Sequence, residues 1–460
     1  MHDNRTLRAK ITNHAQVATS LDQHGWSASK LWNVGLYYLR HEWDETGEIP
    51  DEDELKSELK THYNYKGLHS QSSQKVLEEL SEAFSSWYSS SDPRDNPPGY
   101  RKRNYYDAEG NRVHEEHPRS TVTWKQQGIR HDTKHDQIRL SKGKNHKSSE
   151  HAREYILVEY DIRSDVDIDS IQQVRAVYVD ALNRWELHLV YRNEIATPEP
   201  PGEETAGIDL GISQFAAIAY STGDTALYPG NRLKQDNYYF SKEIAKCDDP
   251  RGERATQLHH TKSERSHQFV HAWAATVADQ CVAHGVSDVY VGSPKGIRTD
   301  EDGDARDWGK HGNLDLHSWP YATATDVLDY KLKECGITLH RSSERRTSKT
   351  CCNCGQERDA NRVERGLYMC DECTIVAHGD VGGAENIRLG LGELIEDHLE
   401  THEDSKSNSE SDEPCRCSRE EMNTVSLYTG EDRSTGRLAR PDVYLYDLST
   451  GFSPREMVVH

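Results

Sequence analysis

Four cysteines in the second half of the chain have the spacing of zinc ligands. Cys351 and Cys354 form one C-x2-C pair, Cys370 and Cys373 form another, and fifteen residues separate the pairs. Thiolates are ligands that zinc prefers, and two such pairs supply four tetrahedral positions. The spacing therefore predicts a structural zinc site, which carries out no reaction because protein ligands fill every position.

Cys352 fits this arrangement less well. A pair made of Cys352 and Cys354 would have C-x-C spacing, so we expect Cys352 to be a spare thiol. The alternative for the whole cluster is a group of reduced, metal-free cysteines. The chain has ten cysteines, and their clustering is unlike a disulfide framework.

Three carboxylates lie in surroundings that suit metal-dependent hydrolysis of a phosphodiester. Asp209 is inside the apolar run AGIDLGI, Glu344 follows the β-rich run ITLHRSS, and Asp380 precedes a predicted helix in HGDVGGAENI. Two strand ends and one helix start can converge, and carboxylate oxygens are ligands that Mg2+ prefers. In a two-ion site, one ion activates the attacking water and the other stabilises the leaving oxygen.

Each carboxylate also has an interpretation without chemistry. Neighbouring backbone N–H groups can satisfy Asp209, which would offset the cost of a charge in a strand core. Asp380 can be the N-cap of the following helix, and Glu344 can be an ordinary exposed side chain. Spacing alone leaves these alternatives open.

The elements that must position these residues change in type along the chain. Residues 15–90 have apolar residues at helical spacing, and residues 121–195 contain β-rich runs with a turn at 182–184. A hairpin turning at STGD is predicted within 206–230, followed by a helical region over about 233–284. Further strands and a helix stopped by Gly336 complete an α/β pattern.

The composition leaves nucleic-acid binding open despite a net charge of −22. Such acidity is typical of a protein that binds no nucleic acid, or of a surface adapted to a salt-rich cytoplasm. No apolar run approaches the ~18–20 residues of a membrane helix. The polar first residues predict no secretory signal, so we expect a cytoplasmic location.

Two basic segments are candidates for contact with nucleic acid. The first combines cations with a ring for base stacking and consists of Tyr100, Arg101, Lys102 and Arg103. The second lies next to Glu344 and consists of Arg345, Arg346 and Lys349. The alternative for both is a solvated surface face.

The chain resembles the TnpB family in a set of motifs that occur in the family's order. They are GIDLG, LHSWPYATATDVLDYKLKECGI, TSKTCCNCG, the second C-x2-C pair and GDVGGAENI. Members of this family are transposon-encoded, RNA-guided DNA endonucleases, long described as OrfB transposases. The resemblance covers about 205–390, is looser over 15–195, and implies that Asp209 and Asp380 are the first and last catalytic aspartates.

The resemblance also implies a domain organisation with an α/β, RNase H-like (RuvC) nuclease core and an inserted four-cysteine zinc ribbon. We expect a β-rich, barrel-like wedge domain at 1–14 and 105–200, a helical recognition domain at 15–104, the nuclease core at 201–345 and 375–400, the zinc ribbon at 346–374, and an acidic, partly disordered tail at 401–460. Such cores rarely need a tail, so its removal is expected to be tolerated.

The chain departs from the family at one catalytic position. Many members have a Glu at the end of the strand where this chain has Gly292 and Ser293. Either the nuclease is inactive, or another residue supplies the carboxylate, and Glu344 at the end of the next strand is the candidate. Other nearby acids, in a polar loop that looks solvated, are Asp300, Glu301 and Asp302.

The resemblance thus implies a Mg2+-dependent DNA endonuclease in which Asp209, Glu344 and Asp380 hold the catalytic ions. Its partners would be a transposon-derived guide RNA and target DNA, in a nucleoid-associated protein without a membrane partner. The alternatives are a nuclease-dead RNA-guided DNA-binding regulator, a transposase or transposase accessory protein, and a zinc-ribbon scaffold. The regulator predicts that Glu344 lies away from the two aspartates.

Overall fold

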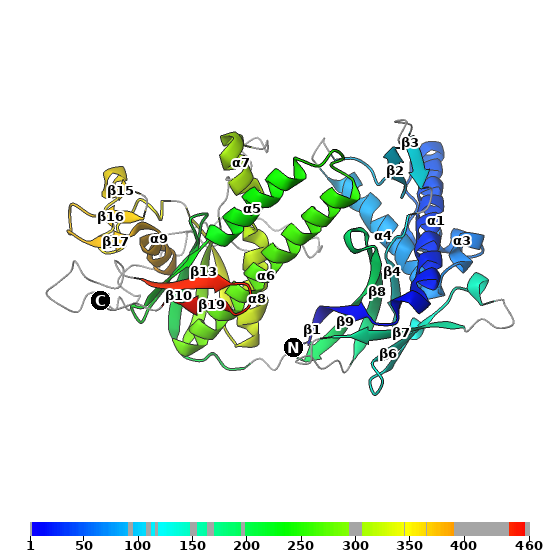
Figure 1. Cartoon of the computed structure of the whole chain (residues 1–460), viewed down its shortest axis with the longest axis horizontal. Coiled ribbons are helices and arrows are strands. Elements are labelled where there is room, and N and C mark those ends of the chain that lie inside the picture. Colours follow the sequence, from blue (N-terminus) through cyan, green and yellow to red (C-terminus); the bar gives the residue numbers. More distant parts are fainter. Residues whose placement is uncertain are drawn as a thin grey trace, which may run out of the picture. The chain divides into compact units, whose positions relative to one another are not determined.

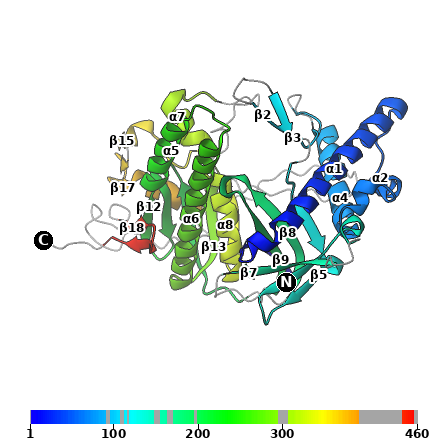
Figure 2. The same ribbon diagram turned by 45° about the vertical axis from the view of Figure 1, so that its right-hand side comes forward.

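A computed structural model describes most of the chain in two compact units, Met1–Ile195 and Ala196–His460 (Figures 1 and 2). The described residues are 2–90, 95–106, 112–115, 118–147, 154–162, 170–194, 198–293, 306–344, 346–364, 366–390 and 441–455. Each unit has its own sheet and its own hydrophobic core. None of the described helices combines the length and apolar character that a membrane span requires.

The helices of the first unit pack around a long helix with a buried apolar face. They are α1 (His14–Thr46), α2 (Glu52–Leu59), α3 (Tyr63–Lys66) and α4 (Ser70–Ser89). Gly35 of α1 lets α4 approach closely, because a Cβ atom there would lie 2.8 Å from Leu80 Cδ2. Helix α1 ends at Gly47, whose φ of +75° is favourable for glycine.

The strands of the first unit form a seven-stranded sheet and a separate two-stranded pair. The sheet has the order β4-β8-β9-β1-β7-β6-β5. The bounds are β1 His2–Ile11, β4 Val122–Lys125, β5 Ile129–Asp132, β6 Gln137–Ser141, β7 Tyr155–Asp161, β8 Ile171–Val179 and β9 Arg184–Glu194, with the pair formed by β2 Arg103–Tyr106 and β3 Arg112–Glu115. The predicted turn at 182–184 is confirmed, since Asn183 has a φ of +49° between β8 and β9.

The second unit is built on a sheet with the order β14-β13-β10-β11-β12-β18-β19. The bounds are β10 Glu204–Leu210, β11 Gln214–Tyr220, β12 Thr225–Pro229, β13 Val286–Ser293, β14 Thr338–Ser343, β18 Asp442–Asp447 and β19 Gly451–Pro454. Strands β10, β11 and β12 pair antiparallel, which confirms the hairpin at STGD, whereas β13 and β14 run parallel to β10.

Helices cover both faces of this sheet. They are α5 (Asn231–Ile244), α6 (Glu253–Ala283), α7 (Gly309–His317), α8 (Tyr321–Glu334) and α9 (Gly379–Arg388). Ala216 and Ile218 of β11 join the core under α6 and α8, and Ala217 and Ala219 join the core under α9. This alternation places the two layers on opposite faces. The predicted helical region over 233–284 consists of two helices, because α5 ends at Ile244 and α6 begins at Glu253.

The cysteine segment forms a small three-stranded sheet of its own. Its strands are β15 (Arg362–Glu364), β16 (Leu367–Met369) and β17 (Val376–His378). Strand β17 leads directly into α9, so this segment, the ribbon, is continuous with the helix that carries Asp380.

Two C-terminal strands lie within the expected tail, 401–460, and belong to the sheet of the second unit. Strand β18 pairs parallel with β12, and β19 pairs with β18. Tyr444, Tyr446 and Phe452 pack against the core of the second unit. The hairpin was missed because a long acidic segment precedes it; residues 391–440, with Cys415 and Cys417, lie outside the described part. The expectation that removing everything after residue 400 is tolerated stays a prediction, and such a truncation would also remove this hairpin.

Candidate active site and zinc centre

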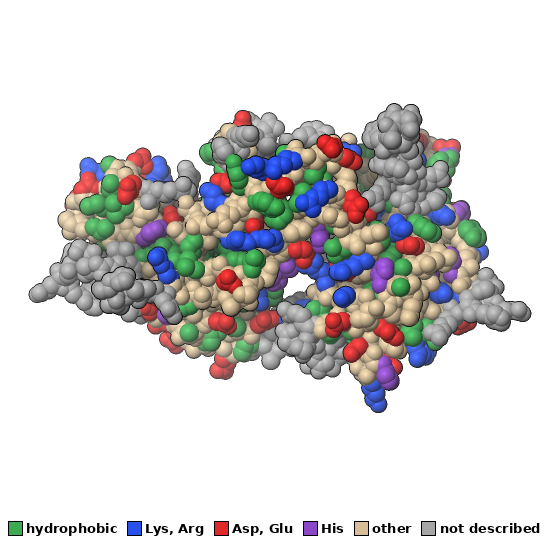
Figure 3. Space-filling view, viewed as in Figure 1, with side chains coloured by type: hydrophobic (Ala, Val, Ile, Leu, Met, Phe, Trp, Pro, Cys, Tyr) green, Lys and Arg blue, Asp and Glu red, His purple; other side chains and the backbone are tan. Residues whose placement is uncertain are grey.

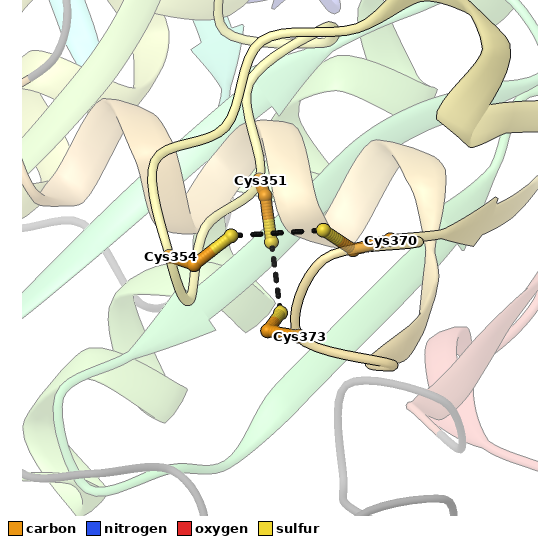
Figure 4. Close-up of side chains that lie close together, drawn as sticks. All are labelled: Cys351, Cys354, Cys370 and Cys373. Atoms are coloured by element: carbon orange, nitrogen blue, oxygen red, sulfur yellow. Dashed lines mark hydrogen bonds between the residues drawn. The ribbon is translucent and has the colours of Figure 1, made fainter.

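The four predicted cysteine ligands converge at one point of the ribbon. The sulfur atoms of Cys351, Cys354, Cys370 and Cys373 all lie within 4.8 Å of one another (Figure 4). Two of the separations, Cys351–Cys373 and Cys354–Cys370, are 3.6 Å. Four sulfurs around one zinc ion, each at ~2.3 Å, would be about 3.8 Å apart. The cluster is therefore compatible with tetrahedral zinc.

Cys352 lies outside this cluster, as the C-x-C spacing predicted. Its side chain is buried and faces α9, where a Cβ atom on Gly382 would lie 3.9 Å from its sulfur. Burial, together with the negative charge of Glu385, raises the pKa of Cys352 to about 12. Cys352 is therefore a protonated core thiol.

Asp209 lies on β10 directly beneath α9. Two glycines let the helix approach the strand: a Cβ atom on Gly207 would lie 2.1 Å from the Ala384 carbonyl oxygen, and one on Gly383 would lie 2.6 Å from Asp209 Oδ2. The Asp209 carboxylate thus faces the helix that carries Asp380.

Asp380 lies in the first turn of α9, with His378 as the N-cap residue. The N-cap interpretation of Asp380 is therefore wrong. Burial, and then the negative charge of Asp380, raise the pKa of Asp209 to about 7, while Arg362 opposes this shift. Arg362 Nη2 lies 3.9 Å from Asp380 Oδ1, so a ribbon cation reaches the carboxylate pair.

Glu344 occupies the space above Gly292. Parallel pairing of β13 and β14 sets Gly292 beside Ser342 and Ser293 beside Ser343, and Glu344 follows immediately. A Cβ atom on Gly292 would lie 2.6 Å from Glu344 Cγ and 2.7 Å from its Oε1. The side chain of Glu344 therefore fills the volume that a side chain at position 292 would occupy.

The environment of the Glu344 carboxyl group excludes the interpretation as an exposed side chain. Its Oε1 atom is buried and has no hydrogen-bond partner within the described residues. Burial, and then the charge of Asp209, raise the pKa of Glu344 to about 8. Glu344 thus neighbours Asp209, which in turn neighbours Asp380.

The segment between Glu344 and the ribbon is tied to α9. The backbone N–H and Oγ1 of Thr347 donate to the Glu344 carbonyl oxygen at 3.2 and 2.9 Å. Asn386 Nδ2, on α9, donates to the carbonyl oxygens of Thr347 and Thr350, both at 2.7 Å. These bonds couple the position of Glu344 to the helix that bears Asp380.

Sequence reasoning missed three residues of this site: Arg362, His378 and Asn386. Burial lowers the pKa of His378, and its Nδ1 atom is buried without a described partner. Only His378 had a signal in the sequence, because it lies two residues before Asp380. Arg362 and Asn386 act through the orientation of the ribbon, which spacing does not reveal.

The oxygen donors of the three carboxylates suit divalent cations, although among the described residues only the four cysteines are drawn together as closely as metal ligands. Burial and the charge of Asp380 raise the pKa of Asp209, and burial and the charge of Asp209 raise the pKa of Glu344. A divalent cation would relieve this repulsion, supply a partner for Glu344 Oε1, and favour the ionised forms. The all-oxygen donor set suits Mg2+.

The residues of the predicted nucleic-acid segment 100–103 differ in exposure and in the groups that they contact. Tyr100 is 39% exposed, whereas the guanidinium of Arg101 lies 3.8 Å above the Trp32 ring and 3.8 Å from Glu79. The Lys102 ammonium lies 5.6 Å from the Tyr100 ring. Arg345 and the side chain of Arg103 lie outside the described residues.

The two other cations predicted beside Glu344 pair with acids of the ribbon. Arg346 lies 3.6 Å from Glu357, and Lys349 lies 2.8 Å from Asp359. Elsewhere, Lys and Arg side chains gather over α5 and α6 on the face shown in Figure 3.

Two family models match the part of the chain that carries these sites. The model OrfB_IS605, described as a probable transposase, matches residues 188–298, which include Asp209 and Gly292. The model of the Cas12f1-like TNB domain matches residues 321–387, which include Glu344, the four cysteines and Asp380. In these two regions the chain is similar to the TnpB proteins.

Named relatives agree with this TnpB relationship. The TnpB-like protein ORF457 of Acidianus two-tailed virus is 30% identical over 228 residues, 46% of this chain and 47% of that protein. The CRISPR-associated endodeoxyribonuclease Cas12f1 of Sulfoacidibacillus thermotolerans is 22% identical over 229 residues, 46% of this chain and 52% of that protein. The matches therefore span about half the length of these relatives.

The fold is similar to that of a solved Cas12f1 structure. A cryo-EM structure titled as a Cas12f1–sgRNA–target DNA complex aligns with a TM-score of 0.51 and 13% identity. The alignment covers 82% of this chain and 84% of that one. At this identity the similarity concerns the fold alone.

Proposed function

We propose that the chain is an RNA-guided DNA endonuclease that hydrolyses phosphodiesters at a RuvC-like site. Its relationship to the TnpB proteins and to Cas12f1, which is named an endodeoxyribonuclease, supports this function. The sheet supports an RNase H-like core, since an antiparallel meander, β10–β11–β12, is extended by two parallel strands, β13 and β14.

The observation that carries the proposal is the position of Glu344 over Gly292. Many family members carry a glutamate where this chain has Gly292 and Ser293, and the Glu344 side chain fills the volume above Gly292 beside Asp209. A relocated carboxylate restores an acidic centre that would otherwise lack one member. This geometry opposes the nuclease-dead alternative, which requires Glu344 to lie away from the aspartates.

The chain's own residues would perform three tasks at this centre. Asp209, Glu344 and Asp380 would hold Mg2+, which when bound activates water and stabilises the leaving oxygen. Asn386 and Thr347 keep the Glu344 segment against α9. Arg362 limits the repulsion between Asp209 and Asp380 and is placed to face a phosphate of the strand to be cut.

The proposed partners are a transposon-derived guide RNA and a target DNA. In guided nucleases, base pairing with the guide reads the sequence, whereas the protein binds duplex shape and phosphates. The first unit would serve this purpose as wedge and recognition domains. The chain's net charge of −22 then requires local basic surfaces rather than a basic protein as a whole.

The test is cleavage of a matched target by the protein–RNA complex with Mg2+. Glu344→Gln is expected to lose cleavage by about 10²-fold or more while target binding persists, because one metal ligand is removed. Glu364→Gln, on an exposed ribbon strand, is the matched control and should cut like wild type. Binding without cleavage by wild type would instead favour a guided DNA-binding regulator.

A further inference from the structure

A hollow of about 440 Å³ lies on the first unit between α1 and α3. A volume of this size falls in the range of small-ligand sites. Its lining combines one cation, two amides, a histidine, an aromatic ring and one apolar residue: Lys30, Asn33, Val34, Tyr37, His62 and Asn64. No carboxylate lines it among the described residues, although the chain contains 78 Asp and Glu.

The one cation that lines this hollow is not balanced by a neighbouring acid. Lys30 is half-buried on α1 and forms no ion pair with a carboxylate in the described part of the chain. A half-buried cation without an acidic partner is a suitable environment for an anion.

The loop that carries Lys142 and His146 is held against α3. Gly143 packs closely against Gly67, because a Cβ atom on Gly143 would lie 2.3 Å from the Gly67 carbonyl oxygen. The backbone N–H of Gly143 donates to His24 Nε2 at 3.4 Å, and Asn145 Nδ2 donates to the Tyr63 carbonyl oxygen at 2.8 Å. The α3 side of the hollow is therefore held in place by packing against this loop.

The other side of the hollow has groups that suit a nucleobase. Tyr37 lines it and is 62% exposed, although large apolar surfaces are normally covered. Asn33 is engaged with the backbone of Arg101, at 2.7 and 3.1 Å, which connects the hollow to the basic segment 100–103. The amide of Asn64 has no partner among the described residues and remains available to a base edge.

We propose that this hollow binds one unpaired nucleotide, with its base against Tyr37 and its phosphate held by Lys30. Stacking on an exposed ring beside lysines is the usual way in which proteins bind single strands. The nucleotide can come from RNA or from a DNA strand, which share this chemistry. The inference rests on the proposed function for its ligand class, but the site is separate from the carboxylate centre.

The test is direct binding of fluorescein-labelled oligouridine and oligothymidine to the full chain, without Mg2+ and at one fixed salt concentration. Tyr37→Ala and Lys30→Gln are each expected to weaken binding about tenfold. Tyr37→Phe should bind like wild type because it keeps the ring. The matched controls are Tyr88→Ala, at an exposed residue of α4, and Lys60→Gln, at the exposed residue that follows α2, and both should leave binding unchanged.

Photocrosslinking of the same strands should identify the peptide that contains Tyr37. A stronger loss with oligouridine would assign the nucleotide to RNA, and an equal or stronger loss with oligothymidine would include DNA. Unchanged binding by folded Tyr37→Ala and Lys30→Gln, with crosslinks elsewhere, would overturn the proposal. Because the assay needs no cleavage, this result would leave the endonuclease proposal untouched, and loss of cleavage in Glu344→Gln would leave this one untouched.

Discussion

The cysteine cluster and the carboxylate centre are both groups of candidate metal ligands, but they are assembled over different distances along the chain. Each half of the zinc centre is one tight turn, 351–354 or 370–373. The carboxylates come from a strand, from the residue after another strand, and from a helix: Asp209, Glu344 and Asp380. Local spacing therefore reveals the first centre, whereas the second depends on strand register and helix packing.

The two centres also differ in what they need from a metal. The ribbon has a small core, so zinc binding contributes directly to its folding. The carboxylate centre is supported by a large sheet with its own core, and two of its acids have pKa values raised to about 7 and about 8. Metal removal should accordingly unfold the ribbon and only change the protonation of the carboxylate centre.

The largest effect is expected from Asp209→Asn. Asp209 neighbours both other carboxylates, so its loss should reduce cleavage by about 10³-fold or more. Zinc content should stay at one ion per chain because the ribbon is assembled independently. Asp329→Asn, on the solvent side of α8, provides the matched control. Metal analysis measures the zinc content, and cleavage rates measure the activity. Loss of zinc in Asp209→Asn would show that the two centres are not assembled independently.

A smaller effect on cleavage is expected from Cys354→Ser. Loss of zinc would loosen the ribbon and with it the segment that Asn386 ties to α9, so cleavage should fall about 10- to 100-fold. The core sheet should remain folded by circular dichroism. Cys352→Ser should keep both zinc and activity, because Cys352 lies outside the cluster. Full cleavage by zinc-free Cys354→Ser would show that the centres are not coupled.

The C-terminal hairpin allows a test at a third region, where neither spacing nor resemblance indicated structure. Ending the chain at residue 440 removes Tyr444, Tyr446 and Phe452 from the core, which should lower the free energy of unfolding by about 2–4 kcal/mol. A chain ending at residue 455 keeps the hairpin and is the control. Urea unfolding of both chains measures the difference, and equal stability would show that the hairpin is dispensable.

The smallest effect concerns the stability of the Mg2+-free protein. In the folded state the pKa of Glu344 is raised from 4.5 to about 8. Between these two pH values the Glu344 carboxyl group is protonated in the folded protein but ionised in the unfolded chain. Stability therefore falls as the pH rises through this interval. Glu344→Gln should raise the melting temperature by a few degrees at pH 8 and change it little near pH 4.

Mg2+ offers the control for this pH dependence. It should stabilise wild type at pH 8 more than Glu344→Gln, because it binds the ionised carboxylates. Thermal unfolding with and without Mg2+ measures both effects. A lower melting temperature for Glu344→Gln at pH 8 would contradict a raised pKa.

The sequence indicated those parts of the sites that lie within single runs of residues. The cysteine pairs, Asp209 in its apolar run and Asp380 before a helix are of this kind. The contact of Glu344 with Gly292 requires the exact pairing of β13 with β14, which are joined by a connection of more than one element. Arg362 and Asn386 depend on how the ribbon turns back onto α9, and no local pattern describes that turn.

The central claim is that Glu344 supplies the carboxylate missing at Gly292, and exchanging the two positions tests it most directly. Glu344→Ala should abolish cleavage, and Gly292→Glu alone should also fail, because its Cβ atom would lie 2.6 Å from Glu344 Cγ. The double variant Gly292→Glu, Glu344→Ala should regain Mg2+-dependent cleavage, because substitutions at two contacting residues can compensate each other. Cleavage by Glu344→Ala at the wild-type rate would contradict the account.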